Sequence, residues 1–332
     1  MSLATSMLAA AARAAGHAPS IHNTQPWRWR VGSTMDLYAD RGRQLGFADP
    51  FGRLLRLSCG AALHHALVAL AAEGWRFDVS RLPDPADPDL LARVALAEPT
   101  AVDPSAVRLL QTMTVRHTDR RPPTDTPVDR DVLARIGRVV HAAGARLHML
   151  DREQVVDLAV AAAQAQAAES FDPEYRAELA YWAGGARTEG TGVPSEAIPA
   201  SAPQTTVPGR DFGEPGTLPI SAGHDGAAVY AILYGDDDRP DSWLRAGEGL
   251  SAGWLEATEL GVSVLPLSAA VEVTRTRHVL RRLLSNIGYP YLVLRLGSAV
   301  ADGQRGNADP DHAGAPPTPR LPADQVVEVT EP

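Results

Sequence analysis

The sequence predicts an α+β fold made of two related halves. Helices are mixed with strands joined by hairpins, which favours this class over a strictly alternating parallel fold. One order of elements also occurs twice, because a long helix ends in glycine and turns directly into a strand at Glu73-Gly74-Trp75 and at Leu260-Gly261-Val262. We therefore expect an N-terminal half over residues 1–105 and a C-terminal half over residues 106–332.

The composition indicates a globular protein with a substantial core. The chain has 332 residues, of which 45% are hydrophobic and 21% charged, as is usual for this class. A net charge of -9 without any basic block argues against nucleic acid or an anionic membrane as partner. The single cysteine, Cys59, excludes an intrachain disulfide, and its apolar neighbours indicate a buried, unreactive thiol.

The alanine-rich start of the chain is predicted to be a helix rather than an export signal. It has no basic leader, and Arg13 interrupts what would be the apolar core of a signal. The helix should stop near Gly16. No apolar run approaches the ~20 residues that span a bilayer, so we expect a cytoplasmic protein.

Periodicity places the elements of the first half. A strand over 27–31 and another over 35–39 form a hairpin through Gly32-Ser33-Thr34. Ser58 can cap a helix whose apolar face carries Leu63 and Leu70, and Gly74 ends it. Strands over 75–79 and 94–96 complete this half.

The second half has the same mixed character. Apolar spacing predicts helices over 104–113, 132–140, 154–170, 241–260 and 279–284, and strands over 147–149, 228–234, 262–265 and 291–296. Residues 184–226, the lid segment, are rich in Gly, Pro, Ser and Thr and almost without apolar periodicity, which is typical of a lid, a binding loop or disorder. The tail over 301–319 is rich in Gly, Pro and Asp and is predicted to be a linker.

The stretch 18–29 is the most informative of the chain. Pro19 and Pro26 fix their own φ angles and push the preceding residues out of the helical region. This predicts a rigid, extended loop lined with hydrogen-bonding groups, which suits the edge of a flat polar heterocycle better than a metal or a phosphate. On these residues alone, a helix stop followed by a turn is equally supported.

A basic cluster follows at Arg116–Arg121. In an extended backbone Arg116, Thr118 and Arg120 share one face, and two guanidinium groups beside a hydroxyl form a phosphate cradle. The same alternation turns His117 and Asp119 away. For this composition, a solvated basic turn is the commoner outcome.

Other kinds of site receive little support. His64 and His65 are adjacent, so on a helix they point about 100° apart and cannot form an i,i+4 metal pair. No metal-binding motif, P-loop or dinucleotide fingerprint occurs. Ser20 and His22 lack the Gly-x-Ser-x-Gly elbow of a nucleophilic serine, which disfavours a hydrolase.

Two motifs resemble the FMN-dependent nitroreductases. Ala18-Pro19-Ser20-Ile21-His22-Asn23-Thr24-Gln25-Pro26-Trp27 is similar to the family's Ala-Pro-Ser-x-x-Asn-x-Gln-Pro-Trp, and Arg116-His117-Thr118-Asp119-Arg120 to its Arg-x-Ser-x-Arg/Lys. The reversed order of the motifs resembles the Acg-type proteins of actinobacteria, over nearly the whole chain. That group implies a three-layer nitroreductase-like fold in which two fused halves form a pseudo-dimer.

The resemblance implies a site for one FMN per chain. It places Arg116 and Thr118 on the phosphate, Arg120 at the N1/O2 edge and a backbone N–H of the turn Pro266-Leu267-Ser268 at N5. The other residues that it assigns to the cofactor are Pro19, Ser20, His22, Asn23, Gln25 and Arg320. Ile21 replaces the family's usual second hydroxyl and Thr118 its serine. His22 has two open roles, a proton donor or a structural hydrogen bond.

The implied activity is NAD(P)H-dependent reduction of nitro-aromatic, quinone-like or other small acceptors through flavin N5. The alternative is an FMN-binding or sequestering protein whose lid excludes nicotinamide and substrate, and flavin fragmentation is a third. A small electron acceptor is the expected partner. The chain would act as a monomeric pseudo-dimer or a homo-oligomer.

Overall fold

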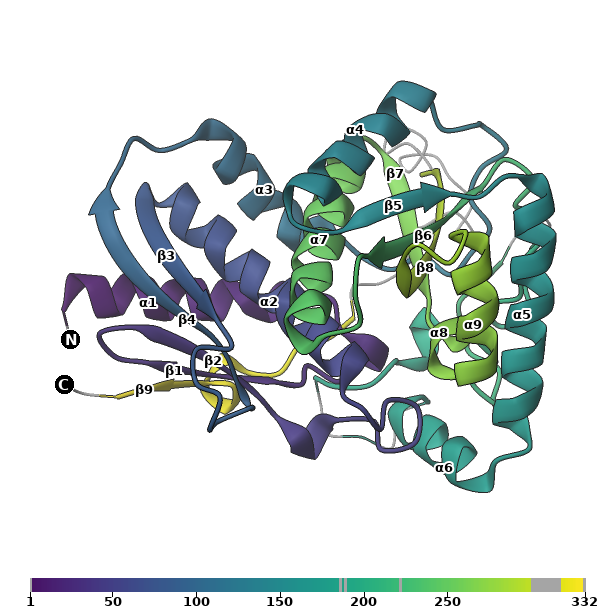
Figure 1. The fold of residues 1–332 in the computed structure, drawn as a ribbon, viewed down its shortest axis with the longest axis horizontal. Coiled ribbons are helices and arrows are strands. Elements are labelled where there is room, and N and C mark those ends of the chain that lie inside the picture. Colours follow the sequence, from purple (N-terminus) through teal and green to yellow (C-terminus); the bar gives the residue numbers. More distant parts are fainter. Residues whose placement is uncertain (1, 185–186, 188–189, 221–222, 300–317, 331–332) are drawn as a thin grey trace.

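The computed structural model describes residues 2–330 except 185–186, 188–189, 221–222 and 300–317. The described residues form two sheets and confirm the α+β class (Figure 1). The first sheet has the order β3-β4-β2-β1-β9, with bounds β1 Trp27–Val31, β2 Met35–Ala39, β3 Trp75–Arg81, β4 Leu90–Pro99 and β9 Val327–Val329. The second has the order β5-β6-β8-β7, with bounds β5 Arg146–Met149, β6 Val229–Gly235, β7 Val262–Leu267 and β8 Tyr289–Ser298. Strands of the N-terminal half build the first sheet together with the C-terminal strand β9, and strands of the C-terminal half build the second.

The helices pack on these sheets and between them. Their bounds are α1 Leu3–Ala14, α2 Arg53–Ala72, α3 Pro104–Val115, α4 Arg130–Ala142, α5 Arg152–Ser170, α6 Pro173–Trp182, α7 Pro240–Glu259, α8 Ala269–Glu272 and α9 Thr274–Leu283. The long helices α2 and α7 lie in the middle of the molecule and pack on each other (Figure 1). The two halves meet at this helix pair.

The two halves share one topology. In each sheet the four-stranded order is the same, since β3-β4-β2-β1 corresponds to β7-β8-β6-β5, and all these pairs are antiparallel. A long helix connects the inner strand to the edge strand both times, α2 before β3 and α7 before β7. Gly74 and Gly261 follow these helices with φ of 71° and 69°, the left-handed conformation that ends a helix.

The contact between α2 and α7 repeats itself across the interface. A Cβ on Gly60 would lie 1.9 Å from the carbonyl oxygen of Leu244, and a Cβ on Gly247 would lie 1.9 Å from that of Leu57. Leu57 and Gly60 are spaced as Leu244 and Gly247 are, so each helix gives the other the same contact. This is the self-complementary pattern of a two-fold interface, here within one chain.

We predict that Gly60→Ala lowers the free energy of unfolding by about 3 kcal/mol, because the added methyl group meets backbone and forces the helices apart. Urea unfolding measures the change. Gly137→Ala in α4 is the matched control, since its Cβ meets nothing within 4 Å and should gain up to about 1 kcal/mol. Equal effects of the two variants would contradict the close packing.

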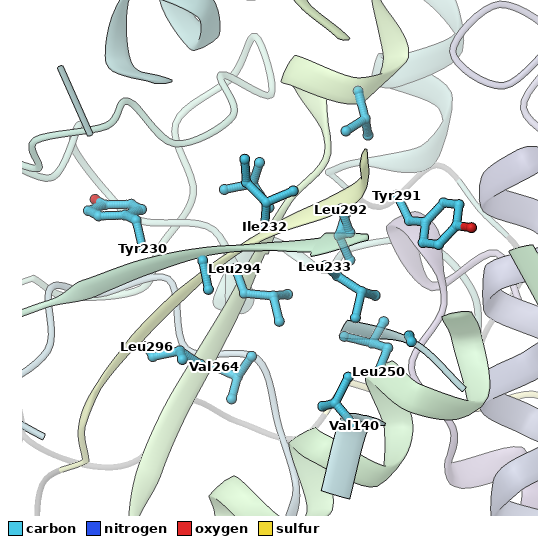
Figure 2. Packing of buried hydrophobic residues seen from close by; sticks show 14 of the residues in the cluster. Val140, Tyr230, Ile232, Leu233, Leu250, Val264, Tyr291, Leu292, Leu294 and Leu296 are labelled. Atoms are coloured by element: carbon cyan, nitrogen blue, oxygen red, sulfur yellow. The ribbon is translucent and has the colours of Figure 1, made fainter. Parts of the chain in front are cut away.

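The second sheet carries the larger apolar core. Ile232 and Leu233 of β6 lie among side chains of β7 and β8, and Leu250 of α7 and Val140 of α4 pack on the same cluster (Figure 2). All four side chains are buried. The core therefore joins the second sheet to α4 and to the central helix α7.

Helix α2 begins earlier than predicted. Its first residue is Arg53, and the Asp49 carboxylate caps it by accepting from the N–H groups of Arg53 (2.7 Å) and Leu55 (2.8 Å). The prediction of Ser58 as the cap is therefore wrong. Its hydroxyl instead donates to the Leu54 carbonyl and accepts from the Ile21 N–H.

Helix α2 is also long and apolar enough to qualify as a membrane span, contrary to expectation. Most of it is buried inside the protein.

The C-terminal tail returns to the first sheet. The unpredicted strand β9 pairs in parallel with β1, from Trp29 opposite Val327 to Val31 opposite Val329. Strand β4 is longer than the predicted 94–96, and helix α6 was not predicted. Most of the linker expected over 301–319 lies outside the described residues, which resume at Thr318.

Cys59 and the paired histidines have structural surroundings. The buried Cys59 thiol contacts the Pro26 carbonyl at 3.2 Å, and burial raises its pKa, as an unreactive thiol requires. His64 and His65 each place Nδ1 2.9 Å from the Ser251 hydroxyl of α7. Burial lowers the pKa of His64 to about 4 and that of His65 well below its usual range.

This histidine pair should make the protein acid-sensitive. The folded state favours neutral His64, so its contribution is complete above pH 6.5 and is lost as the pH falls toward about 4. At pH 5 the loss from His64 is about 2 kcal/mol. Urea unfolding at pH 7.5 and 5.0 tests this, because His64→Gln should lose less stability between the two values than the wild type. His141→Gln, on exposed α4 surface, should match the wild type, and equal slopes for all three proteins would refute the prediction.

Candidate cofactor site

A cavity of about 620 Å³ lies between the two halves. This volume is within the usual range for small-molecule sites. The structure brings eleven of the twelve predicted site residues to its wall: Pro19, Ser20, His22, Asn23, Arg116, Thr118, Arg120, Pro266, Leu267, Ser268 and Arg320. Gln25 does not line it.

The loop before β1 is a compact turn, so the predicted extended conformation is wrong beyond Ser20. Ile21–Asn23 forms one 3-10 turn, and His22, Asn23 and Gln25 have φ of 44°, 56° and 48°. Non-glycine residues in this region are strained, and such strain is typical of binding sites. The Ser20 hydroxyl accepts from the Gln25 N–H at 2.9 Å and closes the turn.

The carboxamides of this turn bind the protein's own backbone. Asn23 Nδ2 donates to the carbonyls of Gly192 (3.1 Å) and Pro319 (2.9 Å). Gln25 Nε2 donates to the Gly190 carbonyl at 2.6 Å, and Gln25 Oε1 accepts from the Leu321 N–H at 3.0 Å. Gln25 therefore lies behind the cavity wall.

Arg116 has no carboxylate paired with it in the part of the chain that the structure describes. It follows the last residue of α3 and is buried, with its guanidinium carbon 4.5 Å from the centroid of Trp254. Its Nε and one terminal nitrogen have no hydrogen-bond partner among the described residues. Burial, and next the charge of Arg320, lower the pKa of Arg116 to about 9.

Three further guanidinium groups, those of Arg120, Arg295 and Arg320, line the cavity without a paired carboxylate in the described part of the chain, and Arg295 donates to the Arg121 carbonyl. Arg320 donates to Asn23 Oδ1 at 3.1 Å, and its Nε has no partner among these residues. Arg120 donates to the Ala197 carbonyl at 3.0 Å. Burial lowers the pKa of Arg120 and that of Arg320 to about 10. Four such guanidinium groups line one cavity, buried at Arg116 and Arg295 and half-buried at Arg120 and Arg320. This arrangement favours an anion in the cavity, because an unpaired buried charge is costly.

The neighbours of these arginines partly follow the predicted alternation. Asp119 is absent from the wall and pairs with Arg121 at 2.8 Å. His117 does line the cavity, contrary to expectation, because residues 116–120 form no regular strand. Thr118 lines the cavity as predicted, as does Arg116.

The segment after β7 forms another part of the wall. The strand continues to Leu267, two residues beyond the predicted end, because Pro266 and Leu267 pair with Leu294 and Val293 of β8. Ser268 then leads into α8. The predicted turn is therefore the end of a strand with one residue beyond it.

The lid segment forms part of the cavity wall. Many of its residues between Val193 and Pro215 line the wall. The Phe212 ring meets the His22 ring edge-on at 6.0 Å, and the guanidinium carbon of Arg120 lies 5.4 Å from the Phe212 centroid. Burial, and then the charges of Arg210 and Arg120, lower the pKa of His22 well below its usual range, so its imidazole is neutral near pH 7.

A buried ionic cluster, which sequence reasoning missed, fastens the lid segment. Arg210 pairs with Glu272 of α8 at 2.5 Å and with Glu169 of α5 at 3.3 Å, and it donates to the Ser268 hydroxyl. Tyr175 of α6 contacts Arg210 and donates to Glu272 at 2.7 Å. Burial raises the pKa of Glu169 to about 7. No local pattern reveals the cluster, because its members are far apart in sequence.

Comparison with known proteins gives two relatives that match nearly the whole chain, both from Mycobacterium tuberculosis strain H37Rv. "Putative NAD(P)H nitroreductase Rv3131" is 40% identical over 322 residues, 95% of this chain and 89% of that protein. "Putative NAD(P)H nitroreductase acg" is 32% identical over 336 residues, 98% of this chain and 96% of that protein. No family model matches the chain.

Among solved structures, the chain is similar to the FMN and NADPH-dependent nitroreductase NfnB from sphigopyxis sp. strain HMH. The TM-score is 0.39 at 19% identity, over 66% of this chain and 97% of that chain. A nitroreductase with bound FMN from Bacteroides fragilis NCTC 9343 gives a TM-score of 0.36 at 15% identity, over 58% and 88%.

Proposed function

The chain belongs to the nitroreductase family, with Acg-like mycobacterial relatives, and from this premise we propose that it is an FMN-binding, NAD(P)H-dependent oxidoreductase. The acceptor would be a small nitro-aromatic or quinone-like molecule. The observation that carries the proposal is the set of four guanidinium groups that line one cavity without a paired carboxylate among the described residues, those of Arg116, Arg120, Arg295 and Arg320.

The residues of the cavity fit this cofactor. The nitrogens of Arg116 and Arg320 that lack a partner among the described residues suit a phosphate, since guanidinium groups present paired donors to its oxygens. His22 Nε2 is also buried without a partner among the described residues, and Ser20 lines the same wall, so both suit the polar edge of a ring system. Apolar side chains such as Leu57, Leu265 and Val293 line much of the rest.

Bound FMN would supply hydride transfer between NAD(P)H and the acceptor. The protein's own residues would hold and orient it. Arg116, Arg320 and Thr118 would bind the phosphate, and Arg120 would favour negative charge elsewhere in the cavity. Neutral His22 would offer one donor and one acceptor nitrogen rather than act as an acid.

The alternative proposal, FMN sequestration with little turnover, is supported by the contacts of the lid segment at the cavity. Phe212 lies against His22 and Arg120, and the Arg210 cluster holds the lid segment down. A closed lid would keep NAD(P)H and acceptor away from the cavity. The two proposals share the cofactor and differ only in access to it.

The visible spectrum of the purified protein tests both proposals. A yellow protein releasing one FMN per chain supports the cofactor, whereas failure to take up added FMN would refute both. Anaerobic addition of NADPH then separates them. Rapid bleaching of the flavin absorbance would exclude sequestration, and a flavin that stays oxidised would exclude the reductase.

A further inference from the structure

The side chains of Asn23 and Gln25 tie together two segments that are far apart in sequence. One is the base of the lid segment, Gly190 and Gly192, and the other is the tail Pro319–Leu321. The Asn23 carboxamide donates to both segments and accepts from the Arg320 guanidinium at 3.1 Å. Both carboxamides are buried, so their hydrogen bonds are shielded from competing water.

The two segments also pack directly on each other. A Cβ on Gly190, whose φ is +96°, would lie 2.6 Å from the carbonyl oxygen of Arg320. The lid base therefore crosses the tail with no room for a side chain. Any displacement of the tail at Arg320 must disturb this crossing.

We propose that Asn23 and Gln25 are positioning residues that fasten Arg320 and the lid base to one another, so that the anion-binding end of the cavity and the lid close as one unit. The inference rests on the proposed function for the identity of the anion, a phosphate monoester. It differs from the family resemblance, which assigns both side chains to the cofactor. Here their polar atoms are already engaged by the chain itself.

The arrangement explains how a distant tail can supply a site residue. Arg320 is half-buried, and its buried Nε has no partner among the described residues. Among the described residues its one side-chain partner is Asn23 Oδ1, and the Thr318 carbonyl at 2.8 Å is the nearest backbone acceptor. Without Asn23, the Arg320 guanidinium loses the side-chain hydrogen bond that orients it toward the cavity.

Binding of FMN and of riboflavin, which lacks the phosphate, tests the role of Asn23. Asn23→Ala should weaken FMN about 10- to 100-fold and leave riboflavin within about twofold. In an Arg320→Ala background it should have no further effect on FMN. Gln325→Ala, an exposed carboxamide on the same tail, is the control and should bind both like the wild type. Equal weakening of FMN and riboflavin, or additive effects with Arg320→Ala, would overturn the proposal.

Hydrogen exchange of the cofactor-free protein tests the coupling without any ligand. Asn23→Ala should speed exchange in peptides from the lid base and from the tail together, and Gln25→Ala should do the same. If Asn23→Ala folds poorly, Asn23→Asp, which keeps the acceptor for Arg320 and loses the amide donor, replaces it. Faster exchange in one segment alone would overturn the proposal. If the wild type binds neither flavin, the proposed function is wrong. The hydrogen-exchange experiment then still tests the coupling of the lid base to the tail, because it needs no ligand.

Discussion

Arg116→Met should give a folded protein that binds FMN at least about 100-fold more weakly than the wild type. The buried guanidinium has donor atoms without partners among the described residues and faces the cavity. Charge-assisted hydrogen bonds contribute about 1.5–3 kcal/mol each. Loss of two such bonds is worth about 3 kcal/mol, or about two orders of magnitude in affinity. Fluorescence titration with FMN measures the change.

The same substitution should make the cofactor-free protein more stable. Burial lowers the pKa of Arg116 to about 9, so at pH 7 the folded state bears the full cost of its charged form. That cost is up to about 5 kcal/mol by linkage. Methionine keeps an unbranched chain that can pack on Trp254 but carries no charge. We expect the melting temperature of the cofactor-free form to rise by about 3 °C or more.

Opposite changes in binding and stability are specific to a charge held in place for a ligand. Arg108→Met, on the exposed surface of the same helix, should change neither property. A variant of Arg116 that binds FMN normally would remove this residue from the site. A variant that binds weakly and also melts earlier would show that the guanidinium is needed for folding.

The elements that sequence reasoning predicted well are those whose signal is local. Strands β1 and β2 have the predicted bounds, because alternating residues flank a turn of Gly32-Ser33-Thr34. Gly74 and Gly261 end α2 and α7 because left-handed backbone favours glycine. The stretch 116–120 was predicted only in part, because Arg116, Thr118 and Arg120 share one wall but His117 lines it as well.

The elements that were missed depend on contacts across the chain. Helix α6 buries Tyr175, Leu179 and Trp182 against Leu45 of the other half, a helical spacing that stands out only once its partner is known. Strand β9 has three residues, too few for a readable alternation. Strained φ angles in the turn after Ser20 are stabilised by partners near residues 190 and 320, which no local rule supplies.

The second large effect should come from Arg210→Ala, which we expect to speed NADPH-dependent bleaching of the flavin about 10- to 100-fold. Arg210 belongs to the lid segment and is the buried counter-charge of Glu272 and Glu169. Removing one partner of a buried ion pair costs about 3–5 kcal/mol, and here that cost falls on the closed lid. Glu169, with a pKa near 7, relieves part of it by taking up a proton.

Whether the destabilised lid speeds bleaching depends on which step limits the entry of NADPH into the cavity. If lid opening precedes entry of NADPH, each 1.4 kcal/mol lost from the closed state raises the open population tenfold. Exchange of bound FMN for free FMN should accelerate with it, because both use the same opening. Arg176→Ala, an exposed arginine of α6, should leave both rates unchanged. If Arg210→Ala accelerates flavin exchange but not bleaching, the lid controls the cofactor alone, which favours sequestration over reduction. If neither rate changes, the Arg210 cluster does not gate the cavity.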